Sequence, residues 1–447
     1  MLIPVVALVA SAMSTPAAQA VDDPTATTTT TPTTVAAAET PACPTPGPAV
    51  TPTFTPPPVD PAAPPPDPWD LSSTADPSWG TSKKSGTTKS QRVNGIVEHD
   101  GIAYFGGEFT KMTPPGGGTT ATRNHLAAVD GATGQLTSWN PNARGNVFAL
   151  ALSADGDWVY VGGDFSSIGG KSAPKLARIH LEDGKIDPNF RPKVNSRVRA
   201  ITLDGDRLYV GGNFTTIGGQ PRPELAAIDP ITGALLPWTP PALGRGRYIG
   251  HTGIPTPDYS PGYVFSIAVI GGKVFAAGNF LNIGCQGGLV TIDAATGGLV
   301  EPQYDPGRPI FDLTTYGGVL YAVGGGPGGT AYAFSPDDQK PLWKVKVDGD
   351  AVGVAASENA VYVAGHYDYI VSKSSSCYQF CPGGPRRHHL LAVGRADGVA
   401  LAWTPDADTS TGPFTVTVGQ DHLYVGGEFN KIDFKAQPGF TIFPGTP

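Results

Sequence analysis

Carboxylate and amide side chains recur along the chain at matched positions, each directly after a Gly-Gly or Ala-Gly pair that ends a short apolar run. The carboxylates are Glu108, Asp164 and Glu428, and the amides are Asn213 and Asn279. A ring of carboxylates could bind Ca²⁺ or act as acid and base. Because most repeats fill this position whatever the charge, we favour a simpler interpretation, in which a strand-end side chain bonds the adjacent loop backbone.

No familiar catalytic or nucleotide-binding motif accompanies these residues. Residues 169–172 (Gly-Gly-Lys-Ser) resemble the end of a phosphate-binding loop, but Phe165 stands where the first glycine must be. The glycine-rich run 324–329 is not followed by a helical pattern, so it is not a dinucleotide fingerprint. Neither Gly-x-Ser-x-Gly nor His-Glu-x-x-His occurs. We therefore expect no cofactor and no bound metal.

Aromatic and cationic side chains are concentrated in and beside two long segments, 241–262 and 366–389. Tyr and Arg are favoured at interfaces because they offer rigid amphipathic area and forked donors, and aromatic rings also stack on sugars. An alternative is that these side chains only hold long loops to the body. The candidate binding residues are Tyr248, His251, Tyr259, Tyr263, Tyr367, Tyr369, Tyr378, Arg386, Arg387, His388 and His389.

Four cysteines are typical of an exported protein with one or two disulfides. Cys377 and Cys381 share one segment, and we expect them to form a disulfide. Cys43 and Cys285 lie elsewhere, and the sequence does not choose among the three complete pairings. A zinc site is less favoured, because a Cys-x-x-x-Cys pair with only His388 and His389 nearby is not a zinc-ligand pattern.

The apolar runs that carry these residues form a repeat along the chain. Successive units are 41 to 66 residues apart, and a unit of this length must stack on its neighbours to bury its faces. Aligned on the central aromatic residue, the runs place seven rings in register: Tyr104, Tyr160, Tyr209, Phe275, Tyr321, Tyr362 and Tyr424.

One unit contains four short apolar runs, which in the third unit are 198–203, 208–214, 225–228 and 234–238. Their Val, Ile, Leu and Tyr content and their Gly, Pro and Asp boundaries predict strands. The first two runs meet at Asp-Gly or Gly-Gly, the third and fourth meet at Asp-x-x-Thr-Gly, and the fourth ends in aromatic-x-Pro. Four antiparallel strands repeated seven times predict an all-β fold, a seven-bladed β-propeller of four-stranded blades.

The last unit supplies only three runs before the chain stops. Asp76 to Trp79 resemble the end of a fourth run. We predict that an N-terminal strand near Trp79 closes the last blade, beside Phe440, because this pairing would remove an exposed sheet edge. The fifth unit departs most from the repeat, since the aromatic-x-Pro end is absent after Trp343, so its boundaries stay open.

The chain before the repeats divides into two segments. Residues 1–20 are predicted to be a signal peptide, although no basic residue precedes the apolar stretch. This stretch is too short for a transmembrane segment. Residues 21–70 contain 15 Pro and 13 Thr, which predicts a disordered tether. The propeller then takes residues 75–447, and we expect a secreted or cell-surface-associated protein.

The charge distribution excludes one class of partner. Seven of the 38 acidic residues precede Lys83, the first basic residue, so the remaining chain carries 30 basic and 31 acidic groups. A near-neutral body without a basic patch argues against a nucleic-acid partner. We expect the protein to be a monomer.

The set of LYVGGNFTTIGG (208–219), LAAIDPITG (225–233) and the aromatic-x-Pro end resembles the delta-60 repeat β-propeller proteins exported by bacteria, of the actinobacterial type. It is distantly similar to the ectodomain of the fungal Rax-type cortical markers. The resemblance covers about residues 92–443 and implies an exported propeller without an established reaction or catalytic residues. The Asp-x-x-Thr-Gly element also looks like a quinoprotein blade motif, but the eight blades and vicinal cysteine pair of that family are absent.

In the predicted propeller, loops between second and third strands share one face with the links between blades. All the long segments, 110–124, 241–262 and 366–389, fall on this loop-rich face. We therefore expect an exported, non-enzymatic binding or adhesion module for a cell-envelope glycan or surface protein. The alternative is a polysaccharide hydrolase or lyase with acids at the channel mouth, which requires two carboxyls about 5–10 Å apart. The acids to examine are Asp312, Glu358, Asp368 and Asp406.

Overall fold

The computed structural model describes residues 71–82, 91–244, 262–283, 286–301, 303–304, 306–326, 328–337, 340–371, 385–408 and 412–445. These residues are all-β: their strands pair in small antiparallel sheets, and they include no helix. Among them there is accordingly no apolar helix of membrane-spanning length. The predicted signal peptide and tether lie outside the described residues.

Seven antiparallel sheets of three or four strands account for most of the described strands, and we number them in chain order. Sheet 1 contains β2 (Val93–His99), β3 (Ile102–Gly107) and β6 (Leu126–Asp130), and sheet 2 contains β7 (Val147–Leu152), β8 (Trp158–Gly163) and β11 (Leu176–His180). Sheet 3 contains β12 (Val198–Asp204), β13 (Arg207–Gly212) and β16 (Leu225–Ile228), and sheet 4 contains β17 (Tyr263–Ile270), β18 (Lys273–Ile283) and β19 (Gln286–Asp293). Sheet 5 contains β20 (Ile310–Tyr316), β21 (Val319–Gly324), β22 (Thr330–Phe334) and β23 (Pro341–Lys346). Sheet 6 contains β24 (Asp350–Ala356), β25 (Ala360–His366) and β26 (Leu390–Gly394), and sheet 7 contains β27 (Pro413–Val418), β28 (His422–Gly427) and β31 (Phe440–Pro444).

Shorter strands pair in the connections after the second strands, in one case with a strand that precedes sheet 1, and the sequence did not predict them. One is a three-stranded sheet of β1 (Gly80–Thr81), β4 (Lys111–Thr113) and β5 (Ala121–Thr122). The others are hairpins of β9 (Ser167–Ile168) with β10 (Lys171–Ser172), β14 (Thr216–Ile217) with β15 (Gln220–Pro221), and β29 (Lys431–Ile432) with β30 (Lys435–Ala436).

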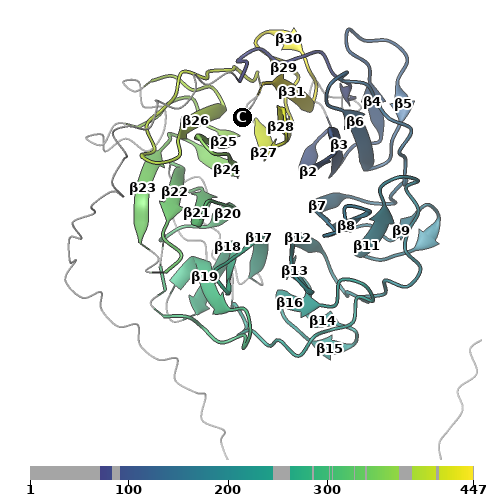
Figure 1. The fold of residues 1–447 in the computed structure, drawn as a ribbon, viewed down its shortest axis with the longest axis vertical. Helices are drawn as coiled ribbons and strands as arrows, with labels where there is room; N and C mark the ends of the chain where they lie inside the picture. Colours follow the sequence, from purple (N-terminus) through teal and green to yellow (C-terminus); the bar gives the residue numbers. More distant parts are fainter. Residues whose placement is uncertain are drawn as a thin grey trace, which may run out of the picture. The chain divides into compact units, whose positions relative to one another are not determined.

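The seven sheets follow one another around a common centre, with the first strand of each sheet innermost (Figure 1). Side chains of these first strands bond the backbone of the next sheet. The Asn94 amide of sheet 1 donates to the Val147 carbonyl of sheet 2 at 2.8 Å. The Thr417 hydroxyl of sheet 7 donates to the Ile96 carbonyl of sheet 1 at 3.0 Å. The last sheet therefore contacts the first through their inner strands.

The aromatic residues of the repeat pack in pairs between neighbouring sheets. The ring centroids of Tyr104 and Trp139 are 5.1 Å apart and edge-on, and those of Tyr362 and Trp403 are 5.5 Å apart. The Trp139 indole donates to the carbonyl of His180 in sheet 2 at 3.2 Å. The ring before the proline therefore packs between adjacent sheets.

The predicted fourth strand is wrong for every sheet except the fifth. In sheet 1 the fourth run pairs with β6 through a single bridge, between Val129 and Leu136. This run is short and ends two residues after Trp139 in a proline, which cannot donate to a ladder. The fourth run of sheet 5 has no such proline and forms β23, so the unit that departs most in sequence has the most complete sheet.

The predicted turns form as their residues require. Asp100 and Gly101 join β2 to β3 with φ values of 49° and 75°, the left-handed conformations of a tight hairpin turn. In the turn after β6 the Asp130 carboxylate accepts bonds from the Thr133 amide at 2.8 Å and from its hydroxyl at 2.7 Å. Hydrogen bonds from Thr232 in the equivalent turn hold the pKa of Asp229 below its ordinary value.

The segment before sheet 1 lies against sheet 7. Asp76 forms a bridge with Ile442, and the Ser72 amide donates to the Pro444 carbonyl at 2.9 Å. Trp79 packs against the core cluster that contains Phe440, as predicted. Asp76 thus holds the place relative to β31 that Thr137, whose amide donates to the Ala128 carbonyl at 2.9 Å, holds relative to β6. The short strand after Trp79, β1, pairs instead with β4, which differs from the prediction that the closing strand lies there.

Candidate functional site

A cavity of about 850 Å³ lies where the inner strands of the seven sheets meet. Its volume is in the range of sites that enclose a small molecule. The lining includes Arg92 and Arg197, which precede first strands, and Glu108 and Asp164, which follow second strands. Because these chain positions belong to the loop-rich face, the cavity opens on that face.

One bulged residue from each inner strand lines this cavity. The ladder between the first and second strands shifts register once in all seven sheets, near the start of the first strand. A bulge leaves one residue outside the ladder and re-aims its side chain. This set was not predicted from the sequence, although an alignment of the first runs would show it directly after the first buried residue. The bulged residues are Asn94, Phe148, Arg199, Phe265, Phe311, Val352 and Phe414.

The bulged residues form a collar of aromatic rings with guanidinium groups against them. The rings of Phe265 and Phe311 are 5.9 Å apart. The Arg199 guanidinium lies 5.1 Å from the Phe148 ring centroid, and that of Arg92 lies 3.6 Å from the Phe414 centroid. Burial lowers the pKa of both arginines from its ordinary value, opposed at Arg92 by Glu108 and Glu428. The collar therefore offers flat apolar faces and fixed donors side by side.

The carboxylate of Asp164 at the cavity rim is already paired with cations. It bonds the Lys175 ammonium through one oxygen and accepts from Nε of Arg197 at 2.7 Å through the other. Burial alone would raise the pKa of Asp164, but the two cations outweigh burial and hold the pKa below its ordinary value. The partners are side chains rather than the loop backbone that the sequence analysis expected.

Asp312 is the exceptional residue of the cavity wall. Its carboxylate accepts hydrogen bonds from the Ser266 hydroxyl of sheet 4 at 2.9 Å, from the backbone amide of the next residue, Leu313, at 2.9 Å and from the Val354 amide of sheet 6 at 3.0 Å. It thereby joins three sheets, and burial raises its pKa to about 6. The corresponding residues of the other sheets, which follow the bulged residue, are Gly95, Ala149, Ala200, Ser266, Gly353 and Thr415.

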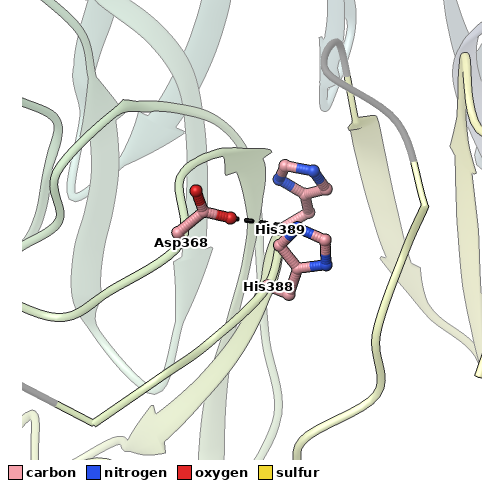
Figure 2. Close-up of side chains that lie close together, drawn as sticks. All are labelled: Asp368, His388 and His389. Carbon is pink, nitrogen blue, oxygen red and sulfur yellow. Dashed lines mark ion pairs between the residues drawn. The ribbon is translucent and has the colours of Figure 1, made fainter. Parts of the chain in front are cut away.

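A second group of polar side chains lies at the base of the connection that follows β25 in sheet 6 (Figure 2). Nε2 of His388 is 3.0 Å from Oδ1 of Asp368, and its Nδ1 contacts Oδ1 of Asp406. The His389 ring stacks on that of His388, with centroids 4.3 Å apart and planes at 21°. Nη2 of Arg386 lies 3.8 Å from Asp406. The structure thus brings three candidate binding residues together with two carboxylates.

The remaining described candidates occupy different environments. Tyr367 is 2% exposed, and its hydroxyl donates to the Val363 carbonyl at 2.7 Å, so its ring is part of the core. Burial raises its pKa well above the ordinary value. The backbone of Tyr369 bridges to Arg386, and Arg387 donates to the Leu401 carbonyl at 3.1 Å.

Tyr263 is separate from this group. It begins β17, and its ring lies 5.7 Å from the Arg199 guanidinium at the cavity. The other predicted residues, Tyr248, His251, Tyr259 and Tyr378, and the cysteines Cys377 and Cys381 lie outside the described residues.

The four acids proposed for a hydrolase are divided among three places. Glu358 lies in the turn between β24 and β25, at the opposite end of the strands from the loop-rich face. Asp312 lines the cavity. Asp368 and Asp406 contact opposite nitrogens of His388, so the imidazole ring lies between the two carboxyl groups. In a glycosidase the glycosidic bond must lie between the two carboxyl groups, and here the imidazole ring occupies that place.

Comparisons with known proteins match parts of the chain. Residues 154–190 match the family model of a β-propeller domain of unknown function, DUF5122. This match runs from the turn before β8 through β11 to Phe190 and does not include β7. A search among curated proteins returned no match. The crystal structure of the computationally designed Ika8 protein aligns with 79% of this chain and 96% of that chain, at 10% identity and a TM-score of 0.44.

Proposed function

We propose that the protein is an exported, non-enzymatic β-propeller that binds a carbohydrate chain of the cell envelope in its central cavity. In this proposal the seven sheets are the blades of a closed ring, and the segment around Asp76 completes the last blade. The ligand enters from the loop-rich face. A carbohydrate is preferred over a surface protein because a chain of sugars can enter a cavity among the inner strands more readily than the folded surface of a protein can.

The contacts between the last and first sheets support ring closure. Phe105 of sheet 1 and Phe440 of sheet 7 stack with centroids 4.5 Å apart and planes at 16°. Val93, Phe105, Tyr424 and Phe440 belong to one buried cluster, equivalent to the clusters between the other neighbouring sheets. The family match to residues 154–190 supports the same architecture for one unit.

The collar of bulged residues carries the proposed binding function. Bulges in a repeat are retained where a side chain must be aimed, and here all seven aim into one cavity. Four of these residues are phenylalanines, whose faces suit the apolar faces of sugar rings. Arg92 and Arg199 supply donors for hydroxyl or carboxylate groups beside those rings.

A glycan array, with the full chain applied with and without EDTA, tests this proposal. We expect binding to one class of envelope glycan without release of shorter products. Phe265→Ala should weaken binding by about 30-fold, the effect of a buried aromatic anchor worth about 2 kcal/mol, and Phe265→Leu should lie between this variant and the wild type. Phe434, which is 87% exposed and does not line the cavity, provides the matched control, Phe434→Ala.

Two results would contradict the proposal. One is the absence of glycan binding, and the other is binding that Phe265→Ala and Phe434→Ala alter equally. Release of shortened glycan would instead favour the alternative of a polysaccharide hydrolase or lyase. The observation behind that alternative is the pKa of about 6 for Asp312 on the cavity wall, which is the range of a general acid.

A further inference from the structure

We propose that Asp368, His388 and His389 bind a divalent transition-metal ion of the zinc class, with Asp406 as the carboxylate that orients His388. This site lies on the loop-rich face of sheet 6. It does not depend on glycan binding in the central cavity.

The donor atoms already lie close together. One ligand atom from each of Asp368, His388 and His389 lies within 4.8 Å of the others. Two donors at about 2.1 Å from one zinc ion can be at most about 4.2 Å apart. A small rotation of the side chains therefore closes the set around an ion. Two imidazoles and one carboxylate suit zinc and its neighbours rather than Ca²⁺ or Mg²⁺, and three protein ligands leave a position for water or a ligand.

The contact between His388 and Asp406 is the second argument. A histidine that binds a metal through one ring nitrogen usually donates its other N–H to a carboxylate, which fixes the tautomer and the ring orientation. Nδ1 of His388 contacts Asp406, so Nε2 faces Asp368 at 3.0 Å. Asp406 is itself held by its backbone, whose amide donates to Asp433 at 2.9 Å.

The backbone holds the ligands on paired segments rather than on a free loop. The Arg387 amide donates to the Asp368 carbonyl at 2.8 Å, and the His389 amide donates to the Tyr367 carbonyl at 2.9 Å. The Asp368 amide in turn donates to the Asp348 carboxylate at 2.8 Å. Side chains on such a support need little reorganisation to bind an ion.

Sheet 1 shows that these residue types are not needed for the fold. Its backbone forms the same bonds, with Arg123 donating to the Thr110 carbonyl at 3.0 Å and His125 to the Phe109 carbonyl at 2.8 Å. Where sheet 6 has Asp368, His388 and Asp406, sheet 1 has Thr110, Asn124 and Asn142. There the Asn124 amide donates to Asn142 at 2.9 Å. An amide pair therefore satisfies the same geometry without offering a metal ligand set.

Zinc binding to the full chain, measured by calorimetry and by metal analysis after dialysis, tests the proposal. The matched variant is Asp368→Thr, His388→Asn and Asp406→Asn combined, which gives sheet 6 the residues of sheet 1. We expect the wild type to bind one zinc ion more per chain than this variant. Because both proteins keep all four cysteines, equal stoichiometries would assign any zinc to other groups and overturn the proposal.

Two further measurements separate metal binding from a simple ion-pair cluster. Asp406→Asn alone should retain the site and weaken its affinity by about 10- to 100-fold, the usual cost of losing an orienting carboxylate. Cobalt(II) substituted for zinc should give visible bands of nitrogen and oxygen ligation without a thiolate charge-transfer band. A thiolate charge-transfer band that persists in the triple variant would overturn the assignment. A wild-type protein that binds no ion, with His388 paired only to the two carboxylates, would also overturn it. Unfolding curves of all variants check that the fold is intact.

Discussion

Sheets 1 and 6 share a three-stranded ladder and the backbone hydrogen bonds at the base of the connection between second and third strands, and they differ in the side chains at that rim. Both place a residue with left-handed φ before the third strand, His125 at 64° and His389 at 70°. Both end the fourth run in a buried tryptophan, followed two residues later by proline and then by Asn142 or Asp406. In sheet 1 the rim residues are two amides and a threonine, whereas in sheet 6 they are imidazole and two carboxylates.

The repeat is constrained at buried and turn positions and is free to vary at the rim. The buried rings and the turn residues are set by packing and by φ, so most sheets repeat them. The rim side chains contact one another and solvent, so a change there alters chemistry without altering the ladder. Functional residues of this protein are therefore expected at repeat positions where one sheet carries a different residue type.

The largest expected effect tests whether the tryptophans of sheets 1 and 6 contribute equally to the free energy of unfolding. Trp139 donates to a carbonyl of sheet 2, whereas Trp403 donates to the Ser72 carbonyl of the N-terminal segment at 3.0 Å. Trp139→Ala and Trp403→Ala should each lower the free energy of unfolding by about 3–5 kcal/mol, the cost of deleting a large buried ring. Urea denaturation of both variants measures the difference.

The phenylalanine variants sharpen this test. Sheet 2 naturally has Phe190 at this position. Trp139→Phe and Trp403→Phe should therefore cost about 1 kcal/mol each, mainly through the lost indole hydrogen bond. If Trp403→Ala cost far less than Trp139→Ala, the N-terminal segment would not act as the equivalent of a neighbouring sheet.

A smaller effect is expected at Asp312, the other position where one sheet departs from the repeat. Burial raises the folded-state pKa to about 6, above the unfolded value of 3.8. Between these values the folded protein holds more protons than the unfolded chain, so stability falls as pH rises through about 6. Since the cavity leaves part of Asp312 open to water, the loss between pH 5 and pH 7.5 should be at most about 1.4 kcal/mol.

Asp312→Asn removes the titrating group and provides the comparison. Urea midpoints of wild type and variant at pH 5 and pH 7.5 give the difference between their pH dependences. The variant should lack the decline that the wild type shows. An identical pH dependence in both proteins would show that Asp312 is not the buried acid of the cavity wall.

The sequence was sufficient for features that depend on local residue type. The Asp-x-x-Thr-Gly turns and the Asp100-Gly101 hairpin follow from φ requirements, and the structure confirms them. The fourth strands were wrong because a run that ends at a proline pairs at only one residue. The ring as a whole remains a proposal that rests on contacts between distant residues such as Phe105 and Phe440.

The candidate sites were less accessible from the sequence. The bulged residues were missed because a bulge interrupts the period of two by one residue, and a single run does not show which residue is extra. The partners of His388 were missed because Asp368 and Asp406 are 20 and 18 residues away in the chain. The pairing of the segments after β25 and before β26 brings Asp368 to His388, and the Ala407 amide, which donates to the His388 carbonyl at 3.5 Å, brings Asp406. Tyr367 was predicted to be a binding residue but is part of the core. Its position in a long segment concealed its equivalence to the buried Phe109.

The most direct test of this account transfers the rim of sheet 6 to sheet 1. Thr110→Asp, Asn124→His and Asn142→Asp, combined, would place the ligand set around His125. Because Thr110 and Asn142 are exposed, the metal-free variant should match the wild type in stability within about 0.5 kcal/mol. We predict that this variant binds one zinc ion more per chain than the wild type. An unchanged stoichiometry in a correctly folded variant would contradict the claim that the rim side chains decide whether such a sheet binds zinc.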